Sequence, residues 1–155
     1  RLSFGLTMRT LLVAALLLAV AGCDSTPTGG QPDPDPEYVG VLVTYRLTLV
    51  GSSFSVGITY TDEEGDTVTD VTDFSRQQTY TQEVLLPPGT SGTFSLSGTG
   101  IVNAGSLTAS ITATRVDTDV EVRSATETAS TSSSGEEATV SASITVAPVE
   151  VPAPL

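Results

Sequence analysis

From Tyr38 onward, apolar and polar residues alternate along the chain in short runs separated by turn-forming residues. In the first run, the apolar side chains at odd positions from 41 to 49 point to one side, and Thr44 and Thr48 point to the other. A period of two is that of a β-strand with one buried face. The pattern predicts strands over about 41–49, 54–60, 66–71, 79–86, 92–98, 107–113, 119–123 and 138–146. No window beyond the N-terminal apolar segment has helical periodicity.

Seven or eight short strands predict an all-β fold, a single antiparallel β-sandwich of the immunoglobulin-like type over residues 38–148. Serine and threonine account for 43 of the 155 residues, as is typical of sheet faces that meet water. The Cys–Trp–Cys pattern of true immunoglobulin domains is absent, because the chain has one Cys and no Trp.

Four connecting segments are also predicted. The short link 51–53 favours an antiparallel hairpin between the strands on either side of it. Asn103-Ala104-Gly105 is typical of a turn. Residues 124–137 contain few apolar side chains and are expected to form a long mobile loop, and residues 149–155 a frayed, flexible tail.

The N-terminal segment has a different pattern. Arg9 precedes an unbroken apolar run over 11–21, which small residues follow up to Cys23. The run is shorter than the ~20 residues that a helix needs to cross a bilayer. A positive leader, a short apolar helix and small residues at its end are typical of a secretory signal peptide. Met8 is the only methionine, so we expect the protein to start there and residues 1–7 to be an over-extended reading frame.

The end of this segment, Val20-Ala21-Gly22-Cys23, resembles the lipobox of bacterial lipoproteins. The resemblance implies cleavage after residue 22, acyl chains such as palmitate on Cys23, and anchoring to a cell-envelope membrane, facing the periplasm or the exterior. Asp24 matches a pattern that favours the inner membrane in enteric bacteria, but the choice of membrane stays open. Two alternatives also stay open. Ala19-Val20-Ala21 fits the cleavage site of ordinary secretion, and the apolar run could remain uncleaved and buried.

Residues 23–37 read CDSTPTGGQPDPDPE and connect the signal to the predicted domain. Pro and Gly disfavour helix and sheet, and the acidic residues repel one another, so we expect a disordered, extended tether. Fully stretched, these residues would span roughly 45 Å. A tether of this kind is typical of the segment behind a lipobox.

Composition excludes several kinds of chemistry. The net charge is −12, and residues 1–22 carry two arginines and no acid, so the chain from Cys23 onward has a net charge near −14. Such acidity disfavours nucleic acid and anionic lipid headgroups as partners. Without His or Lys the chain has no Ser-His-Asp triad, His-based metal site or Schiff-base lysine, which predicts a protein that is not an enzyme. The acidic, lysine-free composition also resembles that of proteins from salt-loving organisms.

The densest acidic cluster is Asp62-Glu63-Glu64-Gly65-Asp66, between two predicted strands. Calcium takes about six to eight oxygen ligands, which an acidic turn can supply in part, so Asp62, Glu64 and Asp66 are candidate ligands. The EF-hand spacing is absent. The competing interpretation is a solvated hairpin turn with Gly65 in the left-handed conformation.

Other candidate residues have weaker patterns. A carboxylate pair for glycoside hydrolysis would come from Asp70, Asp73 and Glu83, but their spacing fixes no such geometry and scattered acids are expected on this surface. The four tyrosines raise the possibility of a sugar-binding face, although two of them are in phase with buried positions. They are Tyr38, Tyr45, Tyr60 and Tyr80.

Two segments together resemble the opening of MmpS-type domains, which are small membrane-anchored partners of mycobacterial RND-type exporters. They are Val43-Thr44-Tyr45-Arg46-Leu47-Thr48 and Val56-Gly57-Ile58-Thr59-Tyr60-Thr61-Asp62 with Gly65, and the strand from Ile111 to Asp117 also fits. The family's Pro-Trp is missing, with Thr79-Tyr80-Thr81 in its place, and a lipobox stands where the family has a transmembrane helix. The sequence therefore predicts an envelope lipoprotein with a non-enzymatic binding or scaffolding domain of unknown ligand. The resemblance implies, as an alternative, an accessory subunit of an envelope transporter, with an envelope protein as partner.

Overall fold

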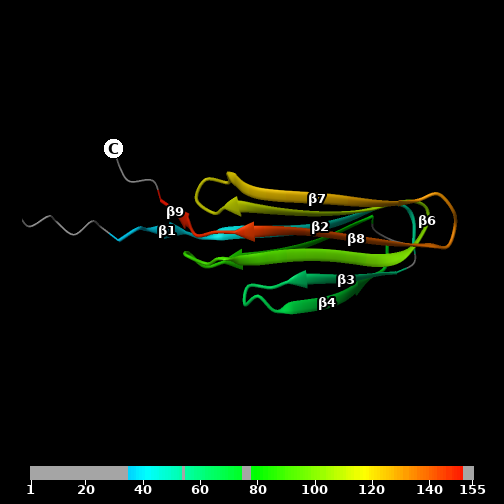
Figure 1. Cartoon of the computed structure of the whole chain (residues 1–155), viewed down its shortest axis with the longest axis horizontal. Coiled ribbons are helices and arrows are strands. Elements are labelled where there is room, and N and C mark those ends of the chain that lie inside the picture. The colour runs from blue at the N-terminus through cyan, green and yellow to red at the C-terminus, as the bar shows by residue number, and fades with distance from the viewer. Residues whose placement is uncertain (1–34, 54, 75–77, 152–155) are drawn as a thin grey trace, which may run out of the picture. The chain divides into compact units, whose positions relative to one another are not determined.

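The computed structural model describes residues 35–53, 55–74 and 78–151. This part of the chain contains strands and no helix (Figure 1). The strands are β1 (Tyr38–Val39), β2 (Val41–Ser52), β3 (Val56–Thr61), β4 (Thr67–Thr72), β5 (Thr79–Leu86), β6 (Gly92–Arg115), β7 (Glu121–Thr131), β8 (Glu136–Val146) and β9 (Val149–Glu150). The predicted all-β class is confirmed, and the eight predicted strand segments all lie within or overlap strands β2 to β8.

The seven longer strands form two antiparallel layers that share β6. The β3 layer runs in the order β4, β3, first half of β6, β8. The β2 layer runs in the order β5, β2, second half of β6, β7. The predicted antiparallel sandwich is therefore present, with β6 hydrogen-bonded in both layers.

The corner of β6 passes the chain from one layer to the other. Pairing with β8 ends at Val102 and pairing with β7 starts at Gly105, and Ala104 between them has a φ of 46°. The predicted turn between two strands is therefore a corner within one strand, because β6 continues from Gly92 to Arg115. A Cβ on Gly105 would collide with the backbone carbonyl of Val50, so the close approach of β2 to the corner requires glycine there.

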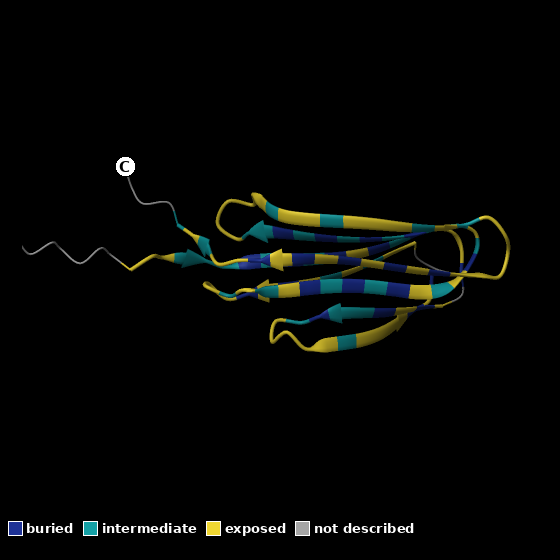
Figure 2. Ribbon diagram, in the orientation of Figure 1, coloured by how far each residue is buried: buried dark blue, intermediate teal, exposed yellow. Residues whose placement is uncertain are grey.

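The hydrophobic core lies between the two layers (Figure 2). The odd-numbered residues of β2 from 41 to 49 are 3% exposed or less, as the alternation predicts. Leu47 faces the β3 layer, where Gly98 of β6 makes room for it: a Cβ on Gly98 would stand 2.7 Å from Leu47 Cδ2. The layers are thus packed against each other at van der Waals contact.

The hairpin predicted through 51–53 is wrong. β2 pairs with β5 and β6, and β3 pairs with β4 and β6, so the link crosses between the layers. Residue alternation tells which side of a strand is buried but not which strand lies next to it. Both edges of β2 are occupied by strands much further along the chain.

The long loop predicted over 124–137 is also wrong, because β7 extends to Thr131 and β8 begins at Glu136. The inner side of β7 carries Ala125, Glu127 and Ala129, opposite Ile111, Ala109 and Leu107 of β6. Because these inner positions carry small or charged residues, β7 lacks the large apolar side chain at every second position by which a strand is recognised. An edge strand tolerates them because one of its sides meets water.

The two ends of the domain pair with each other. Tyr38 and Val39 of β1 lie opposite Glu150 and Val149 of β9, and the Val151 amide donates to the Glu37 carbonyl at 2.7 Å. The start of the predicted flexible tail is therefore a strand. The signal segment, Cys23 and the tether up to residue 34 lie outside the described residues, as do residues 152–155.

Candidate functional site

The acidic cluster forms the hairpin turn between β3 and β4. Asp62 Oδ1 accepts hydrogen bonds from the backbone amides of Glu64 (3.1 Å) and Asp66 (2.8 Å). The Asp62 amide donates to the Asp66 carbonyl at 3.0 Å, and Gly65 has a φ of 87°. The Asp62 carboxylate thus holds the turn together in the manner of an Asx-turn.

Calcium binding at this turn stays a prediction. One carboxylate oxygen of Asp62 is used within the turn, while Glu64 and Asp66 are exposed to solvent. No group of three or more acidic, His or Cys residues suited to a metal ion occurs in the described part of the chain.

Tyr45 connects the two layers. Its ring is fully buried, and its hydroxyl donates to the carbonyl of Thr61, at the end of β3, at 2.6 Å. The ring lies against that of Tyr60, with centroids 5.5 Å apart and planes inclined by 42°. Burial, followed by the charge of Asp62 and the nearby Tyr60, raises the pKa of Tyr45 well above its usual value. These contacts make Tyr45 part of the core.

Tyr80 of β5 lies on the side of the domain where β4 and β5 are the edge strands. Burial first, then the charge of Asp70 and the nearby Tyr60, and then a hydrogen bond with Asp70, raise the pKa of Tyr80 to about 12. Tyr60 and Tyr80 are partly buried and pack against the core. The tyrosines at 45, 60 and 80 therefore hold the layers together at this side, and Tyr38 lies in β1 beside β9.

The carboxylates proposed as a hydrolytic pair point in different directions. Asp70 lies opposite the buried Ile58, on the inner side of β4, whereas Glu83 lies opposite Thr44 on the outer side of β5. Asp73 follows the end of β4. The structure thus brings Asp70 to Tyr80 and does not set it beside Glu83.

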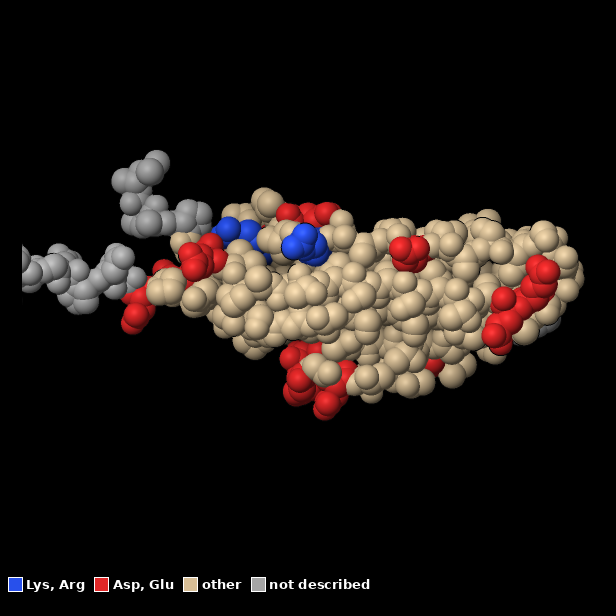
Figure 3. Space-filling view, in the orientation of Figure 1, with Lys and Arg blue, Asp and Glu red and all other residues tan. Residues whose placement is uncertain are grey.

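The outer face of the β3 layer consists mainly of hydroxyl side chains. Thr93 and Thr145 place their hydroxyls 3.3 Å apart across β6 and β8, and Thr99 and Thr139 place theirs 3.2 Å apart. In Figure 3 the acidic side chains of the visible face gather in a few places and leave a broad uncharged surface between them. The hydroxyl positions are Thr59, Thr67, Thr69, Thr93, Ser95, Ser97, Thr99, Thr139, Ser141, Ser143 and Thr145.

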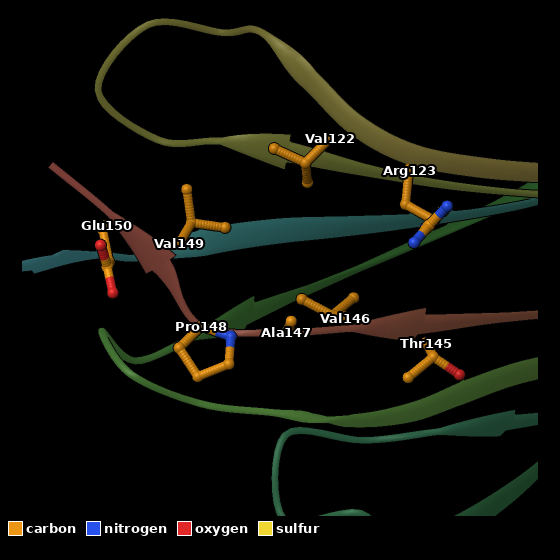
Figure 4. Close-up of a pocket in the computed structure, with 8 residues that line it drawn as sticks. All are labelled: Val122, Arg123, Thr145, Val146, Ala147, Pro148, Val149 and Glu150. Carbon is orange, nitrogen blue, oxygen red and sulfur yellow. The ribbon is translucent and has the colours of Figure 1, made fainter. Parts of the chain in front are cut away.

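A groove of about 410 Å³ lies between the start of β7 and the segment from the end of β8 to β9 (Figure 4). Its walls are largely apolar, with Val122, Val146 and Val149, and Arg123 and Glu150 are the charged residues that line it. Arg123 is exposed and forms no ion pair with any described residue; the ion pair of this region joins Arg115 to Asp117 at 2.7 Å. Sequence reasoning missed this groove because it assigned most of β7 to a loop.

A second groove, of about 320 Å³, is lined by apolar groups where β5 ends. It is bordered by Gly40, Leu85, Leu86, Pro87, Pro88 and Val116. Leu85 and Val116 are more than half exposed. Alternation alone did not predict this patch, because Leu85 occupies an outward position of its strand.

No helix in the described residues has the length and apolarity to span a bilayer. Comparison of the chain with protein-family models, curated proteins and solved structures gives no match.

Proposed function

We propose that the chain is a cell-envelope lipoprotein, anchored to a membrane through acyl chains on Cys23, whose β-sandwich is a non-enzymatic binding or scaffolding module. The non-enzymatic role is supported by one observation: the side chains that could take part in chemistry make contacts that hold the fold together. Asp62 closes a turn, Tyr45 joins the layers, and Tyr80 and Asp70 contact each other at the side of the sandwich. What faces solvent is mainly Ser and Thr on regular strands, a surface suited to contact and not to proton transfer.

The support for the anchor comes from residues 8–23. A positive leader, a short apolar run and a lipobox-like end occur together ahead of a Pro- and Asp-rich segment. The strong acidity of the rest of the chain offers little attraction to anionic headgroups, so an acyl anchor would supply the membrane affinity.

Cell fractionation with mass spectrometry tests the anchor. The native protein is expected in the membrane fraction, with the mass of acyl chains on Cys23, and Cys23→Ser is expected to lose both. Ser25→Ala is the matched control, because it changes a residue two positions after Cys23 without removing the thiol. Native protein in the soluble fraction without added mass would refute the proposal.

The second candidate is an accessory role beside an envelope transporter. The two segments that resemble the MmpS-type pattern, 43–48 and 56–62 with Gly65, lie in β2, in β3 and in the acidic turn that follows β3. Affinity purification after cross-linking in intact cells tests this role. Recovery of an RND-type transporter subunit would support it, and its absence while the protein itself is cross-linked to other partners would favour the first candidate.

A further inference from the structure

β8 presents a long free edge. It pairs with β6 on one side; on the other side it hydrogen-bonds to no described strand, although β7 of the β2 layer lies near it. From Ala138 to Val146 it contains no charge, no Gly and no Pro. Charges, proline and short length are the devices that protect edge strands from pairing with another chain. The other edges have them: β4 is short, Pro87-Pro88 follows β5, and β7 carries Arg123 and Glu127.

The sequence of β8 is nearly symmetric about Ala142. Residues 139–145 read TVSASIT, so the same residue types occur at equal distances on either side. If a second β8 paired antiparallel to the first with Ala142 at the two-fold axis, Thr139 would face Thr145, Ser141 would face Ser143 and Val140 would face Ile144. A two-fold interface requires this self-complementarity. Threonine pairs across strands already occur between β6 and β8.

The centre of this symmetry on β8, Ala142, has a counterpart on β7. Ala125 of β7 lies opposite Ile111, and Ala142 of β8 lies opposite Leu96, so each partner is six residues from the corner of β6 between Val102 and Gly105. Ala125 and Ala142 are therefore at matching positions along the two edge strands.

Arg123 and Glu127 lie two residues before and after Ala125, both on the inner side of β7. Both are exposed, and neither forms an ion pair within the described residues. A two-fold axis through Ala142 would bring Arg123 of each copy close to Glu127 of the other copy, so that two equivalent pairs form. In Figure 4, Arg123 borders the groove at the end of β8 that this glutamate would reach.

We propose that the β7–β8 side is a homodimer interface, in which the β8 strands of two copies pair antiparallel about Ala142 and Arg123 of each copy forms an ion pair with Glu127 of the other. The pairing continues the β3 layer of one copy into that of the second. The interface is independent of the lipid anchor, so either proposal can fail without the other.

Charge exchange tests the pairing. The full chain, purified in mild detergent, is expected to sediment as a dimer at high concentration and to dissociate on dilution. Arg123→Glu and Glu127→Arg singly are each expected to raise the dimer dissociation constant about tenfold or more, because each places like charges together at two symmetric positions. The double variant R123E/E127R is expected to recover most of the wild-type affinity, since it restores both pairs in reverse.

Arg46→Glu is the matched control. It makes the same charge change at an exposed position of β2 and is expected to leave the dimer intact. A wild-type chain that stays monomeric at every concentration would overturn the proposal. So would a double variant that dimerises as weakly as the single variants, or an equal loss of affinity in Arg46→Glu.

Cross-linking in intact cells tests the register. Residues facing each other at the axis have Cα atoms about 4.5–5.5 Å apart, within the range of a disulfide, so Ala142→Cys is expected to give a covalent dimer on mild oxidation. Two controls show how much cross-linking occurs through Cys23 alone. They are the wild-type chain and Ser97→Cys, which places the new thiol on β6, the strand next to β8 and away from the proposed interface. Equal cross-linking in all three would contradict the register.

Discussion

Tyr45→Phe removes one hydroxyl group and leaves the ring that packs between the layers. The lost hydrogen bond joins Tyr45 of the β2 layer to the Thr61 carbonyl of the β3 layer at 2.6 Å. A hydrogen bond of this kind contributes about 0.5–1.5 kcal/mol net, and an unpaired buried carbonyl adds to the loss. We therefore expect the free energy of unfolding to fall by about 1–2 kcal/mol. At about 4–8 °C per kcal/mol for a small domain, the unfolding temperature should fall by about 4–16 °C.

Urea unfolding of the full chain, followed by circular dichroism, measures this change. Tyr38→Phe is the matched control, because the Tyr38 hydroxyl has no hydrogen-bond partner among the described residues, and surface changes of this kind cost less than about 0.5 kcal/mol. The reasoning is refuted if Tyr45→Phe is as stable as Tyr38→Phe, since the hydroxyl would then add nothing to the joining of the layers.

Tyr45→Phe is also expected to change how the stability of the protein depends on alkaline pH. Because the pKa values of Tyr45 and Tyr80 are raised in the folded protein, the unfolded chain loses these protons first as the pH rises past 10. The stabilisation is fully present below pH 10 and is lost progressively through pH 12 and above. Wild-type stability should thus fall over this range, and Tyr45→Phe should fall less steeply. Equal slopes for the two proteins would count against a raised Tyr45 pKa.

Three further substitutions test the glycines of the core and the acidic turn. Gly98→Ala should lower the free energy of unfolding by about 1–3 kcal/mol by crowding Leu47, with the outward Ser97→Ala unchanged in the same thermal melts. Gly105→Ala should cost more than Gly98→Ala, since its Cβ meets backbone that cannot rotate away; a smaller cost would mean that the corner of β6 relaxes. Asp62→Ala should cost about 1 kcal/mol, and Glu64→Ala close to nothing. If calcium binds the turn, excess calcium raises the wild-type unfolding temperature and not that of Asp62→Ala; no rise in the wild type would refute calcium binding.

The strands with a strong apolar alternation were predicted well. The prediction for β5 matches its bounds, and β2 and β8 were recognised from runs of Val, Leu, Ile and Ala at every second position. Most of β7 was missed because its inner positions carry two small residues, Ala125 and Ala129, and the exposed Glu127, which together give no apolar alternation. Asp62 was identified as a notable residue, but its role in the turn follows from hydrogen bonds that no spacing reveals.

Local order along the chain thus determined the class of fold, the buried side of most strands and the candidate anchor at Cys23. These properties depend on neighbours in sequence, on the period of two and on a contiguous apolar run. Only the tertiary structure decided which strands lie side by side, that β6 turns a corner between layers, and that Arg123 and Glu127 stand beside a free β8 edge. Strand partners are chosen by contacts between distant residues, which leave little trace in the local pattern.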